Sequence, residues 1–369
     1  MAGKTKEPLI HITRRGALPW YRSWAIRAGA VILSLLLCAV VTMVTTGDNP
    51  LSVFATIFEA SFSSQRRTWV LFQNLAMLLS VSLAVVPAFR MRFWNLGAEG
   101  QMLAGALATS ACMICLKDVL PNAALIPVML VCSVAAGALW GAIPALCKAK
   151  WGTNETLFTL MMNYVATQIV AYFIIIWESP KGSGKIGIIN AVSEAGWLPV
   201  IGGKQYLLIV ISAVIVTVFM YIYLRYTKHG YELSVVGESQ NTAKYVGINV
   251  GKVIVRTLIL TGLICGFVGW LLVAGTDHTM TTTLEAGRGF LGVMVAWLAH
   301  FNPIGMVLSG LLLVFMGRGA GEISTTFGLN KSFGDILTGI ILFFVIGSEF
   351  FINYQIHFRK SHRKEGADV

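Results

Sequence analysis

Long apolar blocks separated by short polar stretches make up almost the whole chain. Each block approaches the roughly 20 residues that a helix needs to cross a bilayer, and none alternates with the period of two typical of a barrel strand. The expected spans are 25–46, 69–88, 93–116, 122–147, 156–177, 206–226, 253–274 and 335–352, with two shorter pieces at 289–301 and 303–317. Because backbone groups in lipid must bond internally, the pattern predicts an all-α, polytopic transmembrane helical bundle of about 8–10 spans.

The polar stretches define the expected organisation around these spans. We expect a basic tail at 1–24, a transmembrane domain at 25–352 and a basic tail at 353–369. Two connecting loops are long enough to contact partners. One, at about 178–205, is rich in Gly and Ser, and the other, at about 227–252, is polar with a short helical pattern.

Lys and Arg orient the spans. With the N-terminus inside and alternating crossings, 19 of the 28 Lys and Arg residues fall on the inner side. This bias predicts an N-in, C-in protein of the cell (inner, cytoplasmic) membrane, and it requires an even number of crossings in 289–317, as two short helices or a re-entrant hairpin. The first apolar block is too long for a signal peptide and lacks a cleavage site, so we expect it to remain as a span.

Composition agrees with a membrane protein and excludes several functions. Hydrophobic residues make up 56% of the chain and charged residues 12%, against about 25% charged in soluble domains. The net charge of +11 is explained by the cytoplasmic bias, and no basic stretch interleaved with aromatics indicates nucleic-acid binding. The six cysteines lie in apolar blocks and predict neither a disulfide framework nor a metal site. No HExxH or GxSxG motif indicates an enzyme, so no catalytic residue is expected.

The segment 90–105 places polar side chains at the start of an apolar span. Asn95, Glu99 and Gln101 are candidates for the substrate pathway, because a carboxylate in or near the membrane usually faces a protein interior or a wet cavity. Asn95 and Glu99 are four residues apart, which predicts one helix face. The alternative is an interfacial ion pair with an arginine just upstream. Three glycines would let another backbone approach closely: Gly97, Gly100 and Gly105.

The segment 228–251 lies on the expected inner side between two spans. Residues 241–246 can form a short helix that ends at Gly247, a plausible C-cap. An apolar side is expected from Leu233, Val236, Ala243, Tyr245 and Val246. Such a helix can fit a cleft in a soluble partner, and an ordinary amphipathic loop is the alternative.

The segment 285–305 contains a short, glycine-flanked and proline-interrupted helix. Gly289, Phe290 and Gly292 begin it, and Asn302 and Pro303 divide it from the next apolar piece. Broken helices of this kind line the pathway in many transporters. A simple kinked hairpin is the alternative.

These segments together resemble a known family. Residues 93–101, FWNLGAEGQ, resemble the FNIGAEGQ signature of ABC importer permeases of the nucleoside and simple-sugar branch, which is related to ribose-type and branched-chain amino-acid permeases. Residues 237–248 resemble the family's cytoplasmic G-E-N-x-x-A-A-x-Y-x-G-I loop, and 289–305 resemble its G-F-x-G…P-x-G stretch. A weaker match to the family consists of Asn154-Glu155 together with Asn163-Tyr164. The matches occur in the family's order, with departures at 240–241, 294–297 and 299–300.

The resemblance implies a permease subunit that works with partners. These are a cytoplasmic ABC ATPase, a second permease subunit (a sister chain, giving a heterodimer), an extracytoplasmic substrate-binding lipoprotein and membrane lipid. The chain has no GxxxxGK[ST] phosphate loop, so it is expected to bind no cofactor itself, and ATP with Mg²⁺ would be used by the ATPase. The loop implied to engage the ATPase contributes Gly237, Glu238, Asn241, Ala243, Tyr245, Gly247 and Ile248.

The substrate implied by the resemblance is a nucleoside, whose hydroxyls and ring nitrogens suit amide and carboxylate partners. Glu99 has a structural alternative, in which it stabilises the N-terminus of its own helix through the helix dipole. A ribose-like sugar or a branched-chain amino acid is the alternative within the same class. An ion-coupled secondary transporter is a further alternative, which would predict more acidic or histidine side chains inside the membrane.

Overall fold

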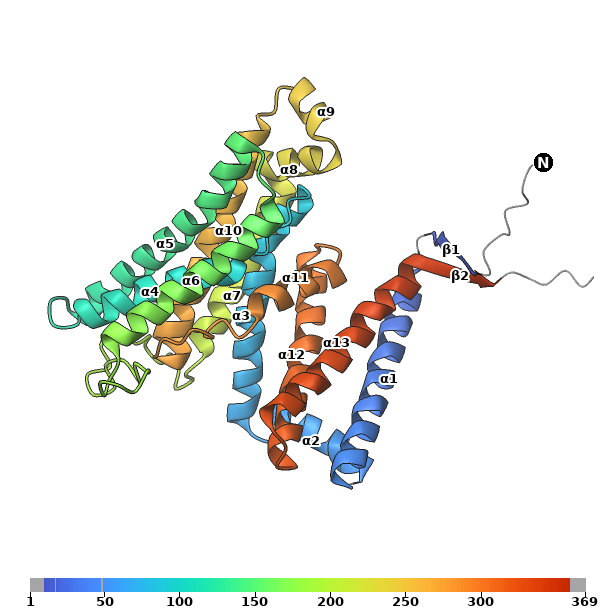
Figure 1. Ribbon diagram of the computed structural model, residues 1–369, viewed down its shortest axis with the longest axis horizontal. Coiled ribbons are helices and arrows are strands. Elements are labelled where there is room, and N and C mark those ends of the chain that lie inside the picture. Colours follow the sequence, from blue (N-terminus) through green and yellow to red (C-terminus); the bar gives the residue numbers. More distant parts are fainter. Residues whose placement is uncertain (1–9, 17, 48, 359–369) are drawn as a thin grey trace, which may run out of the picture. The chain divides into compact units, whose positions relative to one another are not determined.

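The computed structural model describes residues 10–16, 18–47 and 49–358 of the chain (Figure 1). Within these residues, eight helices are long and apolar enough to cross a membrane. The contacts divide the chain into two compact units, one formed by residues 61–315 and the other by the terminal segments up to Ala60 and from Met316 onward. The expected helical membrane bundle is confirmed.

The unit 61–315 contains most of the helices. They are α3 (Gln65–Arg90), α4 (Ala98–Cys115), α5 (Asn122–Trp151), α6 (Glu155–Trp177), α7 (Leu207–Tyr226), α8 (Lys228–Glu238), α9 (Gln240–Tyr245), α10 (Val250–Leu272) with a π-helical turn (Val273–Asp277), α11 (Arg288–Leu298) and the first half of α12 (Pro303–Thr326). Side-chain oxygens cap several of them. Asn154 accepts a hydrogen bond from the Leu157 amide at the start of α6, and Ser239 accepts one from Thr242 at the start of α9, which satisfies otherwise unpaired amides.

The terminal unit contains α1 (Trp20–Thr46), most of α2 (Pro50–Phe62), the second half of α12 and α13 (Lys331–Asn353). Arg27 of α1 forms a buried ion pair with Glu349 of α13, with 2.6 Å between Nη2 and Oε1. Two short strands, β1 (Ile10–Arg14) and β2 (Tyr354–Phe358), pair antiparallel, with Ile10 opposite Phe358 and Arg14 opposite Tyr354. Neither α2 nor this ribbon was predicted from the apolar pattern.

Close contact between α4, α5 and α10 forms the core of the larger unit. A Cβ atom placed on Gly266 would lie 2.5 Å from the Ser133 carbonyl oxygen, and one on Gly105 would lie 2.6 Å from the Gly266 Cα. The Ser133 hydroxyl donates to the carbonyls of Gly105 and Gly266, at 2.9 and 2.7 Å. Small residues at such crossings let helix backbones pack in direct contact, as we expected for Gly105.

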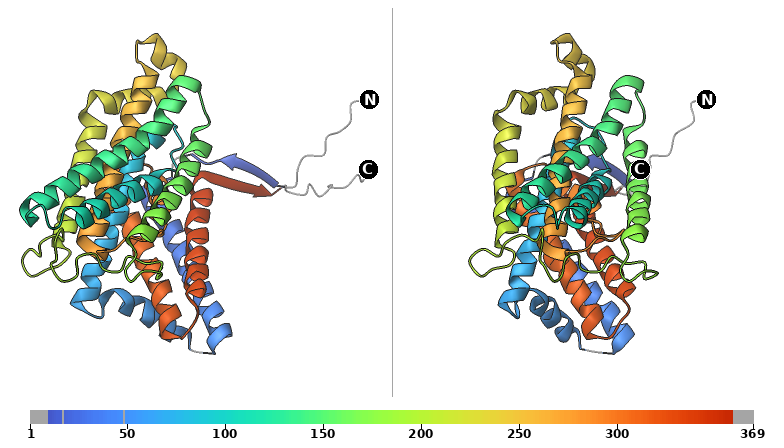
Figure 2. Two further views of the ribbon diagram at one scale, coloured as in Figure 1. Left: turned by 60° about the vertical axis from the view of Figure 1, so that its left-hand side comes forward. Right: turned by 90° about the vertical axis from the view of Figure 1, so that its left-hand side faces the viewer.

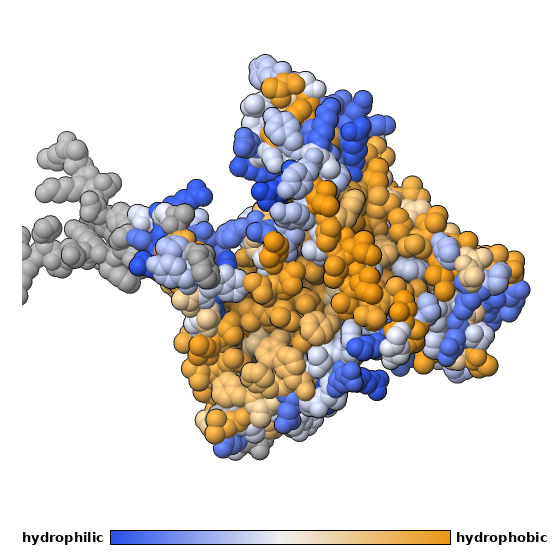
Figure 3. Space-filling model, turned by 180° about the vertical axis from the view of Figure 1, so that it is seen from behind, coloured by the Kyte–Doolittle hydropathy of each residue, from blue (hydrophilic) through white to orange (hydrophobic). Residues whose placement is uncertain are grey.

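The segments that connect the helices of the larger unit lie at its two opposite ends (Figure 2). Helices α8 and α9 form one end, and the loop 178–206 lies at the opposite end. A belt of apolar side chains covers the surface between them (Figure 3). The loop is tied to the end of α10, because the Ile189 amide donates to the His278 carbonyl and the Trp197 ring stacks on His278 at 3.8 Å.

The segment after α10 breaks the helical pattern. From His278 the chain runs without regular helix to α11, which packs along α3 with Gly292 against Val81 and Ser82. Helix α12 then begins at Pro303 and continues to Thr326, so the predicted end at 317 was too early. Glycine and arginine at 317–321 lowered the local hydropathy without ending the helix, because α12 has packing partners there, as at Gly319 against Ile57.

Candidate transport pathway and coupling surface

The turn before α4 is fastened to α6. The amide of Leu96 donates to the Thr159 hydroxyl at 3.1 Å, and the Leu96 carbonyl accepts from the Asn163 amide nitrogen at 2.8 Å. The Asn163 side-chain oxygen accepts from the Gly100 amide, also at 2.8 Å. The turn and the first residues of α4 are therefore held in one position by two side chains of a neighbouring membrane helix.

The three pathway candidates in this segment have different environments. Asn95 and Gln101 are fully buried, whereas Glu99 is partly exposed. The expectation that Asn95 and Glu99 share a helix face is wrong, because α4 begins only at Ala98. Asn95 instead folds its side-chain oxygen onto the Gly97 amide at 3.0 Å, a local bond that competes with helix formation.

Glu99 faces the N-terminus of α11 rather than the arginines upstream. Its carboxylate interacts electrostatically with the carboxylate of Glu285 and with the Phe290 amide. Gly289 contacts the Glu99 side chain so closely that any Cβ there would overlap it. A carboxylate at a helix N-terminus meets free amides and the positive end of the helix dipole. Of the predicted break residues, Gly289 and the half-exposed Phe290 therefore lie beside Glu99, whereas Gly292 packs on α3 and Asn302 and Pro303 lie at the start of α12.

Two carboxylate oxygens in this site are buried acceptors with unused bonding capacity. Within the described residues, Glu99 Oε1 and Glu285 Oε2 have no hydrogen-bond partner. Buried polar atoms are normally bonded, so each such atom calls for an explanation. Buried carboxylate acceptors of this kind are suited to hydroxyl or amine donors on a solute.

Arg288 balances the charge of this cluster. Its guanidinium donates to Asn74 Oδ1 on α3 at 3.2 Å and to the carbonyls of Leu284 and Glu285 at 3.2 and 3.3 Å. The carboxylates of Asp277 and Glu285 lie near enough to interact with it electrostatically. Sequence analysis did not select Arg288, Glu285 or Asp277. The available signal was a group of three charges between two apolar helices, the kind of intramembrane charge that is usually functional.

Aromatic rings gather at the other end of α11. Trp94 and Trp297 stack with centroids 5.5 Å apart, and Phe89 and Phe301 complete the group. The turn that follows is closed by Asn302, whose side-chain oxygen accepts from the Ile304 amide at 3.1 Å as α12 begins. The residues Asn302 and Pro303 therefore form the connection between two helices, as their pattern indicated.

Helix α6 exposes polar groups in the middle of an apolar span. Tyr164, Gln168 and Tyr172, spaced four apart, lie on one exposed face and line a shallow groove with Val165 and Ile169. Sequence analysis missed this stripe, although the i, i+4, i+8 spacing was visible. An amide facing lipid would lack hydrogen-bond partners, so this face is expected to meet protein or water.

Helices α8 and α9 form a compact projection at one polar end. Gly237 packs so closely on the Arg90 carbonyl that no larger residue fits, and Ala243 is fully buried. Tyr245 is 92% exposed and Val246 is 65% exposed, so these two members of the expected apolar side are presented to the outside of the projection. Gly247 follows with φ = +82°, a conformation that favours glycine.

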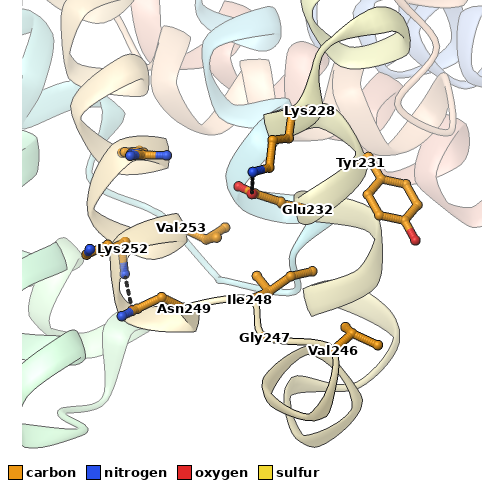
Figure 4. Close-up of a pocket in the computed structure, with 10 residues that line it drawn as sticks. Lys228, Tyr231, Glu232, Val246, Gly247, Ile248, Asn249, Lys252 and Val253 are labelled. Atoms are coloured by element: carbon orange, nitrogen blue, oxygen red, sulfur yellow. Dashed lines mark hydrogen bonds and ion pairs between the residues drawn. The ribbon is translucent and has the colours of Figure 1, made fainter.

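A pocket of about 480 Å³ lies between α8, the turn after α9 and the first turns of α10 (Figure 4). Glu232 of α8 points toward α10, whose residues Lys252 and Val253 line the opposite side, and Tyr231 lies at the rim. The turn at Gly247 and Ile248 closes one side. Of the residues implied to engage an ATPase, the structure thus buries Ala243, exposes Tyr245, and places Gly247 and Ile248 at this pocket.

Comparison with known proteins assigns the chain to a family. Residues 68–346 match the branched-chain amino acid transport system / permease component family. The chain is 29% identical to the guanosine ABC transporter permease NupP of Bacillus subtilis, over 92% of this chain and 96% of that one. It is 27% identical to the glucose ABC transporter permease TsgB13 of Haloferax volcanii, with 88% of each covered, and 26% identical to the nucleoside ABC transporter permease NupB of Lactococcus lactis, with 86% and 88% covered.

These matches agree with the eight apolar helices and with the order of the sequence motifs. They exclude the membrane-enzyme interpretation, and an ABC permease implies an ATPase and a binding protein as partners. The chain belongs to the branched-chain amino-acid type permease family, and it is a multi-pass ABC transporter permease of the nucleoside and sugar type.

Proposed function

We propose that this permease carries nucleosides into the cell along a path bordered by α6 and by the Glu99–Glu285 site. The observation that supports it most is the pair of unused carboxylate oxygens beside the N-terminus of a broken membrane helix. Carboxylates accept hydrogen bonds from hydroxyl groups, and nucleosides carry hydroxyls on the ribose. Two of the relatives above are named for guanosine or nucleosides.

A sugar is the second candidate, because the same acceptors would also suit glucose, the solute named for the Haloferax relative. In both cases the site offers few polar contacts, which suits a path that must release its solute. High affinity would belong to the separate binding protein. A second permease, a sister of this chain, would supply the opposite wall and face the α6 stripe.

Energy for transport would enter through the tip of α9. Tyr245 and Val246 are exposed apolar side chains on a projection whose base is fixed by Gly237 and Ala243. A partner ATPase that closes on nucleotide would hold this tip differently in its two states. Differential binding of two conformations is sufficient to shift the membrane helices between outward-open and inward-open arrangements.

Co-expression with the ATPase, permease and binding protein encoded beside it tests this function. We expect the complex to purify through a tag on this chain, and guanosine or uridine with the binding protein to stimulate ATP hydrolysis more than ribose or glucose. Stimulation by glucose alone would select the sugar alternative. Solute uptake driven by an ion gradient without the ATPase would contradict the proposal.

The coupling surface has its own matched test. Tyr245→Ala should weaken association with the ATPase, whereas Tyr226→Ala, an exposed tyrosine at the end of α7, should leave it unchanged. Substitutions at Ala243 are unsuitable, because this side chain is buried and the helix itself would be disturbed. Equal association of the two variants would show that the ATPase binds elsewhere.

A further inference from the structure

The pocket between α8 and α10 is lined by more positive than negative side chains. Lys228, Lys252 and Arg256 line it together with a single acid, Glu232. Lys228 and Glu232 are 4.0 Å apart, and the lysine side chain is 90% exposed, so this ion pair is weak. Within the described residues, neither Lys252 nor Arg256 has a carboxylate partner among the ion pairs. The pocket is therefore complementary to an anion.

The position of the pocket along the chain indicates its depth. Lys228 follows the last residue of α7 by two positions, and Arg256 lies in the second turn of α10. Both helices are apolar spans, so the cations lie where these spans leave the hydrocarbon. Phe219 and Ile222, about two turns and one turn before the end of α7, are exposed apolar side chains. An occupant here can keep an anionic group among the cations while an apolar part follows α7.

The remaining lining residues suit an amphipathic occupant. Val246, Ile248 and Val253 provide an apolar floor, and Tyr231 lies at the rim (Figure 4). Tyr245, which is 92% exposed at the end of α9, does not line the pocket. The surface proposed for the ATPase and the cationic pocket therefore overlap only at the turn after α9.

We infer that this pocket binds the headgroup of an anionic phospholipid of the inner leaflet, with Lys252 and Arg256 contacting the phosphate. Basic pockets at the cytoplasmic ends of membrane helices bind such headgroups through charge. A lipid held there would connect α8 to α10, and so would stiffen the base of the projection that carries α9. The inference does not depend on which solute the permease carries.

Lipid retention by the full-length chain tests this inference. The protein is purified in mild detergent, and binding of phosphatidylglycerol and phosphatidylcholine is followed by native mass spectrometry. We expect phosphatidylglycerol to bind more tightly, and the double variant Lys252→Gln/Arg256→Gln to weaken its binding about 30-fold, from roughly 1 kcal/mol per lost charge. The matched control Lys150→Gln/Lys244→Gln removes two inner-side charges outside the pocket and should retain the lipid.

Four results would overturn the inference. One is equal binding of the two lipids, and another is equal loss in the pocket and control variants. The third is displacement of phosphatidylglycerol by millimolar inorganic phosphate, which would show that a free phosphate is the ligand. If the pocket variant lost the ATPase but kept the lipid, the pocket would belong to the ATPase interface and the lipid assignment would be wrong. Size-exclusion profiles identify any variant that fails to fold.

Discussion

Helices α6 and α7 are both apolar spans with most of their surface exposed, yet their exposed faces differ. The exposed face of α7 is entirely apolar until Arg225, with Ile211, Val214, Ile215, Val218, Phe219 and Ile222. The exposed face of α6 includes an amide and two tyrosine hydroxyls at Tyr164, Gln168 and Tyr172. Hydropathy identifies both as spans, and only the composition of the exposed face separates a lipid-facing helix from one that faces a pathway or a partner.

The largest expected effect concerns the charged cluster of Arg288, Glu285 and Asp277, which contacts α3 through Asn74. Arg288→Met would leave the carboxylates of Glu285 and Asp277 without their cation, which should cost about 3–5 kcal/mol of folding free energy. The measurement is the chemical unfolding of the purified chain in detergent. Adding Glu285→Gln to the Arg288→Met variant should restore part of the lost folding free energy. No loss in the single variant would mean that these charges are solvated and do not form a buried cluster.

Introducing a charge compares the two faces directly. Val218→Lys on α7 and Val165→Lys on α6 replace side chains of similar exposure, 53% and 47%, each near the middle of its helix. A lysine facing lipid should cost about 2.5–3.5 kcal/mol, so we expect a much lower folded yield for the α7 variant by fluorescence-detected size-exclusion chromatography. Equal folded yields of the two variants would show that the exposed faces of α6 and α7 do not differ in their surroundings.

Removing a polar group from α6 should reduce transport and leave folding intact, and its expected effect is smaller. Gln168→Met should reduce transport about five- to tenfold, as expected for the loss of one hydrogen bond of about 1 kcal/mol, with normal folding. Thr217→Val on α7 should have no effect, because the Thr217 hydroxyl bonds only to its own helix, at the Ala213 carbonyl. Radiolabelled uptake in membrane vesicles makes the comparison, and a transport defect in the α7 variant alone would reverse the assignment.

The smallest effect is a pH dependence at the inner end of α7. His229 on α8 lies between Tyr223 of α7 and Thr257 of α10, near Glu232 and Arg256. Burial lowers the pKa of His229 below its ordinary 6.5, so the folded protein favours the neutral ring. The stability that the neutral His229 ring contributes is therefore present above pH 6.5 and is lost as the pH falls below it. His229→Gln should show a smaller fall in melting temperature between pH 7.5 and 5.5 than the unchanged chain.

Sequence patterns predicted the spans well because hydropathy and length decide membrane insertion. The starts and ends of helices were less accessible. The prediction that one helix carries both Asn95 and Glu99 was wrong, because a local hydrogen bond from the Gly97 amide to Asn95 replaces the first helical turn. The predicted end of α12 at 317 was too early, because packing supports the glycines that follow. Helix α2 is too short to be distinguished from a loop by hydropathy.

The site was predictable in part, through Glu99 and the break at Gly289. The motif pattern placed both in functional segments, and the structure brings them into contact. Arg288 and Glu285 were not predicted, because a charge between two apolar blocks has the same appearance in sequence whether it lies in a loop or inside the bundle. The α6 stripe needed knowledge of which face of the helix is exposed.

Site-specific photo-crosslinking tests the central claim, that α6 borders the path between two permeases. The photoreactive residue p-benzoylphenylalanine replaces Tyr172 on α6 or Phe219 on α7, two aromatic residues that are 63% and 48% exposed, in the co-expressed complex. We predict a permease–permease adduct from the Tyr172 position and lipid adducts alone from the Phe219 position. A permease–permease adduct from Phe219, with none from Tyr172, would contradict the account.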